Sequence, residues 1–198
     1  MDEPNEDAAP PRVFGAAVLD ANVLYPAPLR DLLLRLAEQG LYRPRWSAQI
    51  LEELRRNIVA DRRSNEERAQ RLLTEMRRHF LGAEVRPRPE VIERMTNAVE
   101  DRHVLAVAVQ SGADIIVTSN LRDFPATALA PLGVEAHSPD EFLRQMYESD
   151  PQAIVKVLVD QAAALIAPPL TVDDVLNALD LHAPQTLRLI RETENFGT

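Results

Sequence analysis

The chain has 198 residues, 45% of them hydrophobic and 27% charged, a composition typical of a folded globular protein with one main domain. It has no cysteine, which excludes disulfides, thiolate zinc sites and cysteine nucleophiles and fits a reducing cytoplasm. No apolar run approaches the roughly 20 residues of a membrane helix, and the acidic, proline-rich residues 1–12 are interpreted as a flexible solvated tail, not a signal peptide. We therefore expect a soluble, cytoplasmic protein.

The net charge of -9 is unevenly distributed along the chain. Residues 30–102 carry sixteen arginines against thirteen acids, whereas residues 1–29 and 103–198 are acidic. Arginine favours bidentate contacts with phosphate, but a coding bias that replaces lysine by arginine explains the excess equally well. The charge pattern is thus compatible with a phosphate-bearing substrate without establishing one.

The first predicted elements are a strand, a helix and an extended segment. GAAVLD is a short buried strand that ends at Asp20. A helix over about residues 29–39 follows, and the LYRPRW segment is expected to be extended.

Two capped helices come next. Ser47 is expected to cap a helix over residues 48–63, and Ser64 with Glu67 has the spacing of a capping box that opens another. Residues 84–100 contain two prolines and are interpreted as a strand, a loop and a short helix.

Residues 101–125 are the most informative segment. A helix is expected from Asp101 to Gln110, followed by a stop at Gly112 and a buried strand, DIIVTS. Helix, tight turn and strand in this order, with a strand upstream, predict an α/β domain with a mainly parallel central sheet flanked by helices. LGVEAHS is a further strand, and Ser138 caps the next helix. Residues 149–198 are expected to form a helical C-terminal extension that packs on the main domain or on a partner.

Polar residues follow two of the predicted strands. Asp20 ends the first strand, and Thr118, Ser119 and Asn120 end the DIIVTS strand. Parallel α/β sheets bind ligands at the carboxyl ends of their strands, so these side chains are expected to meet at one sheet edge.

Three more acids are candidates for the same edge. Asp101 lies on the apolar side of its helix, although a structural helix cap explains it equally well. Helix phase places Glu53 at the edge of the core and Glu52 toward water. Asp123 follows Asn120 by three residues and has an ordinary structural interpretation as a loop cap.

Convergence of three or four carboxylates would be costly unless a divalent cation neutralised them. Oxygen ligands without cysteine favour Mg²⁺ or Mn²⁺ over zinc. Such clusters carry out metal-assisted hydrolysis of phosphodiester bonds.

The segments VLDANVLYP, ILEELRRNI and EDRHVLAVAVQSGADIIVTSNLRDFP, in this order, resemble the acidic motifs of PIN-domain ribonucleases, and of VapC-type toxins among them. The resemblance covers about residues 13–137 and implies a three-layer PIN-like fold for residues 13–148. It further implies a magnesium-dependent endoribonuclease that acts on RNA, is often a homodimer and is inhibited by a cognate antitoxin.

The resemblance also assigns roles to individual residues. It implies that Asp20 and Asp101 bind the metal, that Glu53 holds the cation or orients its water, and that Asn120 stands where many PIN domains have aspartate. The candidate catalytic residues are Asp20, Glu53, Asp101 and Asp123. The candidate metal ligands are Asp20, Asp101 and Asn120, and the supporting residues are Asn22, Thr118 and Ser119. Arg102 and His103 are interpreted as helix-start residues.

Two other functions remain open at this stage. A phosphohydrolase with Asp20 as nucleophile is one, although such enzymes usually place a second aspartate where this chain has Asn22. The other is a non-catalytic PIN-like module that binds a protein. Metal-dependent nuclease activity separates these functions.

Overall fold

The computed structural model describes residues 14–61, 65–164 and 169–194, so the predicted acidic tail at residues 1–12 lies outside the described residues. The elements follow the chain in this order: β1 Ala16–Leu19, α1 Ala21–Leu24, α2 Ala27–Glu38, β2 Arg43–Arg45, α3 Ala48–Ala60, α4 Glu66–His79, α5 Pro89–Arg94, η1 Val99–Asp101, α6 Arg102–Ser111, β3 Ile115–Val117, η2 Leu121–Asp123, α7 Ala126–Leu129, η3 Ala130–Leu132, β4 Glu135–His137, α8 Pro139–Ser149, α9 Pro151–Ala163, α10 Val172–Leu179 and α11 Pro184–Thr193.

Within the described residues, four short strands form one sheet in the order β2-β1-β3-β4. Val18 of β1 lies opposite Arg45 of β2 and Ile116 of β3, and Ile116 lies opposite Ala136 of β4. All three pairings are parallel, which confirms the predicted sheet. The carboxyl ends of β1 and β3 therefore meet at one edge.

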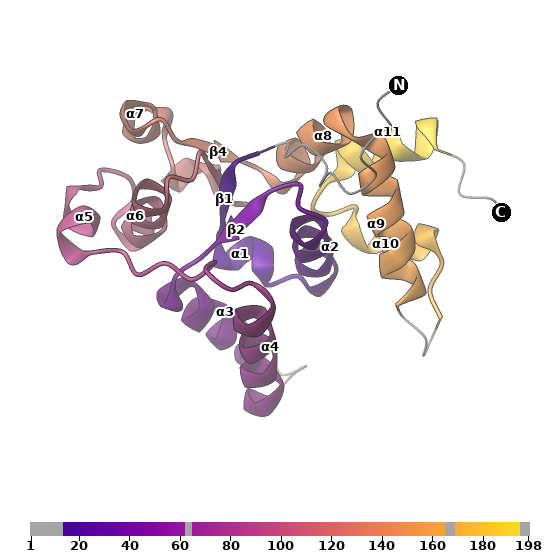
Figure 1. Cartoon of the computed structure of the whole chain (residues 1–198), viewed down its shortest axis with the longest axis horizontal. Coiled ribbons are helices and arrows are strands. Elements are labelled where there is room, and N and C mark those ends of the chain that lie inside the picture. The colour runs from indigo at the N-terminus through magenta and orange to yellow at the C-terminus, as the bar shows by residue number, and fades with distance from the viewer. Residues whose placement is uncertain (1–13, 62–64, 165–168, 195–198) are drawn as a thin grey trace, which may run out of the picture.

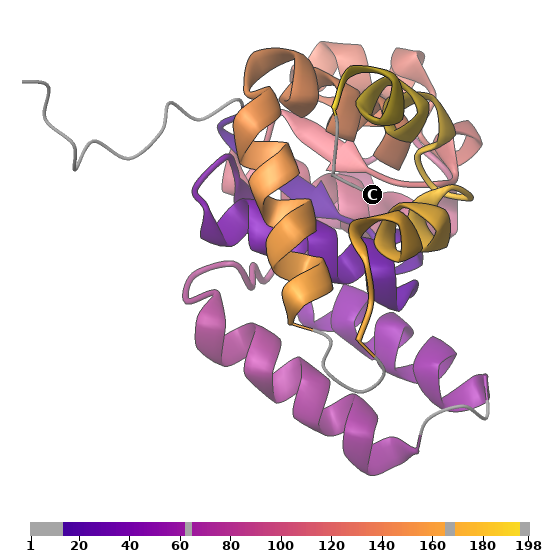
Figure 2. The ribbon, with the colours of Figure 1, turned by 90° about the vertical axis from the view of Figure 1, so that its right-hand side faces the viewer.

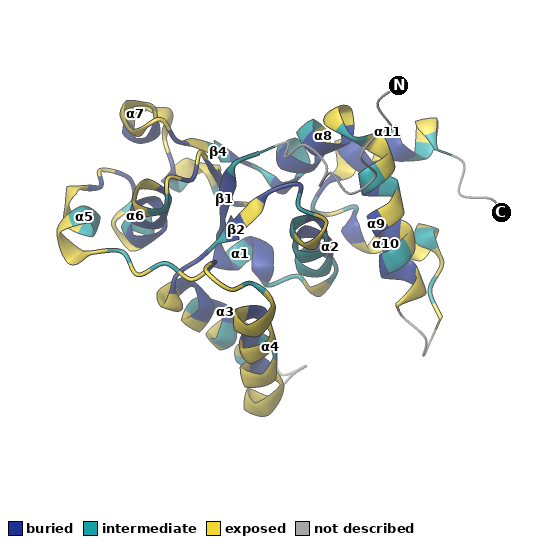
Figure 3. Ribbon diagram, in the orientation of Figure 1, coloured by how far each residue is buried: buried dark blue, intermediate teal, exposed yellow. Residues whose placement is uncertain are grey.

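Helices cover both faces of this sheet. Figure 1 shows α6 on one side of the strands and α2 on the other, and α6 contacts β1, β2 and β3 while α2 contacts β2. Strands β1 and β3 are buried throughout, as expected for apolar strands covered on both faces (Figure 3). The predicted three-layer α/β architecture is confirmed.

Helices α3 and α4 form an antiparallel pair that projects from the sheet (Figure 2). The Ser47 hydroxyl caps α3, as predicted, by accepting a hydrogen bond from the Ile50 amide at 3.2 Å. The predicted cap of α4 was wrong: Asn65 caps this helix by accepting from the Arg68 amide at 3.0 Å, and Ser64 lies outside the described residues. Asparagine and serine cap equally well, so the residue next to the first helical turn takes the role.

The three C-terminal helices pack against the main domain. Helix α9 contacts α2 and α8, and α11 contacts α8 (Figure 2). The buried apolar residues of this region belong to the same core cluster as those of the sheet. At the junction, the Gln161 amide donates to the Pro28 carbonyl at 3.0 Å. The described helices include none that is long and apolar enough to cross a membrane.

Candidate functional site

The Asp20 carboxylate is the buried centre of the site. Asp20 directly follows β1, and only 5% of its surface is exposed. Its Oδ2 atom accepts hydrogen bonds from Asn22 Nδ2 at 2.6 Å and from the Thr118 hydroxyl at 2.7 Å. Burial raises the pKa of Asp20, and the hydrogen bond from Thr118 offsets part of this rise.

The supporting residues join the carboxyl ends of β1 and β3. Asn22 Oδ1 accepts a hydrogen bond from the Ser119 backbone amide at 2.9 Å. The Thr118 hydroxyl also accepts one from the Asn120 backbone amide, at 3.1 Å. Thr118 therefore contacts Asp20 through its hydroxyl, whereas Ser119 contributes its backbone amide.

Asp101 precedes α6 and does not cap it, because its side chain makes no capping hydrogen bond with that helix. Its pKa is raised to about 6, first by burial, then by the charges of Asp20 and Asp123 and by a hydrogen bond with Asp123. The structural interpretation as a helix cap is thus not realised. The three aspartates instead form one electrostatically coupled cluster.

Glu53 reaches this cluster from α3, whereas Glu52 is exposed and bonds Arg55 at 2.7 Å. The predicted orientation of the two glutamates is confirmed. The charge of Glu53 contributes to the raised pKa of Asp20. Burial alone would raise the pKa of Glu53, but contacts with His103 and Gln49 hold it below its usual value.

His103 is the residue that the sequence interpretation missed. It is only 4% exposed, and its Nε2 atom lies 3.2 Å from Glu53 Oε1. When its ring is protonated, the charge of His103 also favours the ionised forms of Asp20 and Asp101. The available signal was a histidine inside the apolar run HVLAVAV, which is unusual for a solvated helix start.

Asn120 and Asp123 form the outer part of the site. The Asn120 side-chain amide donates a hydrogen bond to Asp123 Oδ2. The next residue, Phe124, is 3% exposed and anchors this loop in the apolar core. Asp123 thereby stays within electrostatic reach of Asp101.

The donor set suits a hard cation. Asp20, Asp101 and Asp123 offer oxygen atoms alone, and burial and repulsion favour the protonated form of Asp101, whose proton a divalent cation could replace. In the described part of the chain, no three acidic or histidine side chains stand close enough together to hold a metal ion with their side chains as placed. The chemistry of these residues fits Mg²⁺ or Mn²⁺, although the side chains do not form a preassembled metal site.

A four-stranded parallel sheet with acidic residues at its carboxyl edge defines a class of α/β proteins with an acidic site, and comparison with known proteins identifies the family. The PIN domain model matches residues 16–122, and the chain belongs to the PIN domain family. A second model, the VapC50 C-terminal domain, matches residues 139–192.

A curated relative agrees with these matches. The chain is 42% identical over 99 residues to the Mycobacterium tuberculosis H37Rv protein named "Putative ribonuclease VapC50", and the match covers 48% of this chain and 57% of the relative. The chain thus spans little more than half the length of that relative. No solved structure matches.

Proposed function

We propose that the protein is a Mg²⁺- or Mn²⁺-dependent endoribonuclease that hydrolyses RNA phosphodiester bonds. The observation that carries this proposal is that Asp101 lies within electrostatic reach of both Asp20 and Asp123, so that burial first, and then the charges of these two aspartates, raise its pKa to about 6. Membership of the PIN domain family and similarity to a protein named as a ribonuclease support it. Acids with perturbed pKa values at the carboxyl edge of a parallel sheet are typical of functional sites.

The residues of the site would have separate roles in binding the cation and in orienting its ligands. Asp20 and Asp101 would hold the cation together with the carbonyl oxygen of Asn120. The bound cation would lower the pKa of a water molecule and stabilise charge on the phosphate oxygens. Thr118 and Asn22 fix the orientation of the Asp20 carboxylate through their hydrogen bonds.

Two further acids complete the proposed machinery. Glu53 would orient the attacking water as a hydrogen-bond acceptor, because His103 contacts its carboxylate and its lowered pKa keeps it ionised. Asp123, bonded to Asn120, would hold that amide toward the metal side of the site.

The biological setting is proposed from the resemblance to VapC-type toxins. The protein would be the toxin of a toxin–antitoxin pair, active in the cytoplasm, with a cognate antitoxin as inhibitor and a second copy of the chain as partner. Similarity to the VapC50 sequence and to the VapC50 C-terminal domain model supports this setting. Copurification of the chain with the product of an adjacent small gene tests it.

Substitution of the coupled acids tests the activity. Asp20→Asn and Asp101→Asn should each lower RNA cleavage at least about 100-fold while circular dichroism stays unchanged. Glu52→Gln, which changes the exposed neighbour of Glu53, is the matched control and should keep wild-type activity. Hydrolysis of p-nitrophenyl phosphate without RNA cleavage would instead favour the phosphohydrolase, and neither activity would favour the binding module.

A further inference from the structure

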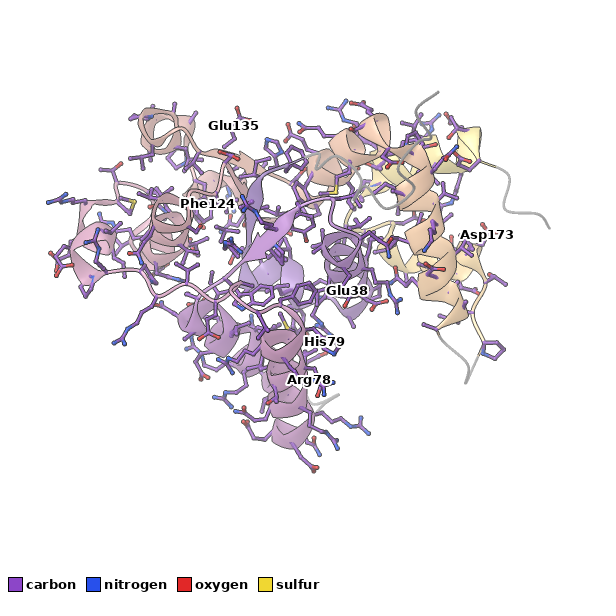
Figure 4. The ribbon with its side chains drawn as sticks, viewed as in Figure 1. Glu38, Arg78, His79, Phe124, Glu135 and Asp173 are labelled. Carbon is purple, nitrogen blue, oxygen red and sulfur yellow. The ribbon has the colours of Figure 1, made fainter. Side chains whose placement is uncertain are left out.

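A hollow lies beside the outer edge of the sheet, at β4. Its volume is about 580 Å³, and it is lined by α7, η3, β4 and the start of α8. Apolar side chains of Phe124, Leu129 and Val134 form part of its wall. Figure 4 labels Phe124 and Glu135 in this part of the molecule.

The backbone of β4 has an open hydrogen-bonding edge. The Glu135 amide donates to the Asp114 carbonyl at 2.9 Å, and the His137 carbonyl accepts from the Thr118 amide at 3.0 Å, so both residues face β3. Backbone groups alternate in direction along a strand, which turns the amide and carbonyl of Ala136 away from β3. Ala136 lines the hollow, and no further strand follows β4 in the described sheet.

The titratable side chains that line the hollow are two glutamates and a histidine. Glu135, whose side chain is 77% exposed, and Glu141 both line it. His137 is only 4% exposed and also lines it. Its Nε2 atom lies 3.0 Å from Glu135 Oε2, and its Nδ1 atom is buried without a hydrogen-bond partner. An open strand edge with an apolar wall and acidic rim is complementary to an extended, basic and apolar peptide.

We propose that this β4 groove binds an extended peptide segment of a partner protein, which adds a strand beside Ala136 and places basic side chains against Glu135 and Glu141. The apolar side chains of the peptide would alternate with the basic ones and pack on Phe124 and Leu129. A flat apolar ligand would leave the open backbone groups unpaired, so the strand edge favours a peptide.

The groove is connected to the acidic site through η2. Leu121 and Phe124 line the groove, and they bracket Asp123 in the chain. A bound peptide would therefore restrain the segment that carries Asp123. Peptide binding itself does not depend on the proposed nuclease function, so the two can fail separately.

A fluorescent synthetic peptide of seven residues that alternates valine with lysine and arginine tests the proposal with the full chain. We expect saturable binding by fluorescence anisotropy, and amide chemical-shift changes concentrated at residues 121–124 and 134–137. Replacing the basic residues of the peptide by glutamate, or methylating its backbone nitrogens on the pairing edge, should weaken binding about tenfold or more.

Two variants and one control locate the site. Glu135→Lys reverses the charge of the rim, and Ala126→Trp fills the groove from an exposed lining position; each should weaken binding about tenfold. Ala163→Trp, at an exposed position on α9, should leave binding unchanged. Thermal unfolding checks that each variant folds. If Ala126→Trp does not fold, Glu135→Lys alone tests the proposal.

Three results would overturn the proposal. One is equal binding of the basic and acidic peptides. The second is binding that both groove variants leave unaltered. The third is a dimer of the free chain, detected by sedimentation, that Glu135→Lys dissociates, because a second copy of the chain would then occupy the edge.

Discussion

At the scale of single residues, Asp101 carries the most specific consequence. Its pKa is about 6 in the folded chain, against about 3.9 in an unfolded one, so between about pH 4 and pH 6 the folded state binds the proton more tightly. The contribution of Asp101 to stability without metal should therefore be greatest below this window and should be lost as the pH rises through it. Urea unfolding of the wild type and of Asp101→Asn between pH 4 and pH 7 measures this. The free energy of unfolding should depend less steeply on pH in the variant than in the wild type. The same pH dependence of the free energy of unfolding in both proteins would contradict the raised pKa of Asp101.

His103 is expected to position Glu53. His103→Leu removes the contact with Glu53 Oε1 and should lower kcat about 10- to 100-fold with little change in KM, as removal of an orienting partner commonly does. His103→Gln, which keeps a donor near the carboxylate, should recover most of the loss. Equal activity of His103→Leu and the wild type would show that Glu53 needs no such partner, and calorimetric titration with Mn²⁺ gives a readout independent of turnover.

The sequence predicted the orientation of the acids Glu52 and Glu53 but not the contact between Glu53 and His103. Glu53 could be distinguished from Glu52 because helix phase alone decides which side chain faces the core. His103 could not be assigned, because its partner lies fifty residues away on another helix. Contacts between side chains distant in sequence depend on packing, which local patterns do not encode.

At the scale of elements, the start of α11 depends on a carboxylate from α8. Asp140 accepts hydrogen bonds from the backbone amides of Gln185 and Thr186 at 3.0 and 2.9 Å, and from the Thr186 hydroxyl at 2.7 Å. Asp140→Ala should lower the free energy of unfolding by about 2 kcal/mol, because the first backbone amides of α11 lose their acceptor, while the Thr186 hydroxyl keeps the backbone carbonyl of residue 140 at 2.8 Å. Urea unfolding measures this.

Asp173→Ala supplies the control for that measurement. Asp173 lies in the first turn of α10 with an exposed side chain, so its removal should change stability by about 0.5 kcal/mol or less. Equal losses in the two variants would mean that the carboxylate of Asp140 has no special structural role.

Most elements could be predicted because each has a local signal. The Ser47 and Ser138 caps and the left-handed Gly112 stop are all found in the structure. The four-residue helix α1 was not predicted, because so short a helix depends on burial of its apolar residues and not on its own propensity.

At the scale of the whole molecule, the C-terminal helices and the sheet share one core. We therefore expect a single cooperative unfolding transition. Trp46, the sole tryptophan, is fully buried near α3 and α4, so its fluorescence reports on the main domain while circular dichroism reports on all helices. The two signals should change at the same urea concentration. Earlier loss of the circular dichroism signal would show that the extension unfolds by itself.

The measurement that most directly tests the proposed function is a calorimetric titration of Mg²⁺ and Mn²⁺ into the wild type and Asp101→Asn, with RNA cleavage assayed on the same samples. We predict that the wild type binds a cation and cleaves RNA, and that the variant, although folded, loses both properties. A wild type that neither binds a cation nor cleaves RNA would contradict the nuclease function and leave a protein-binding module.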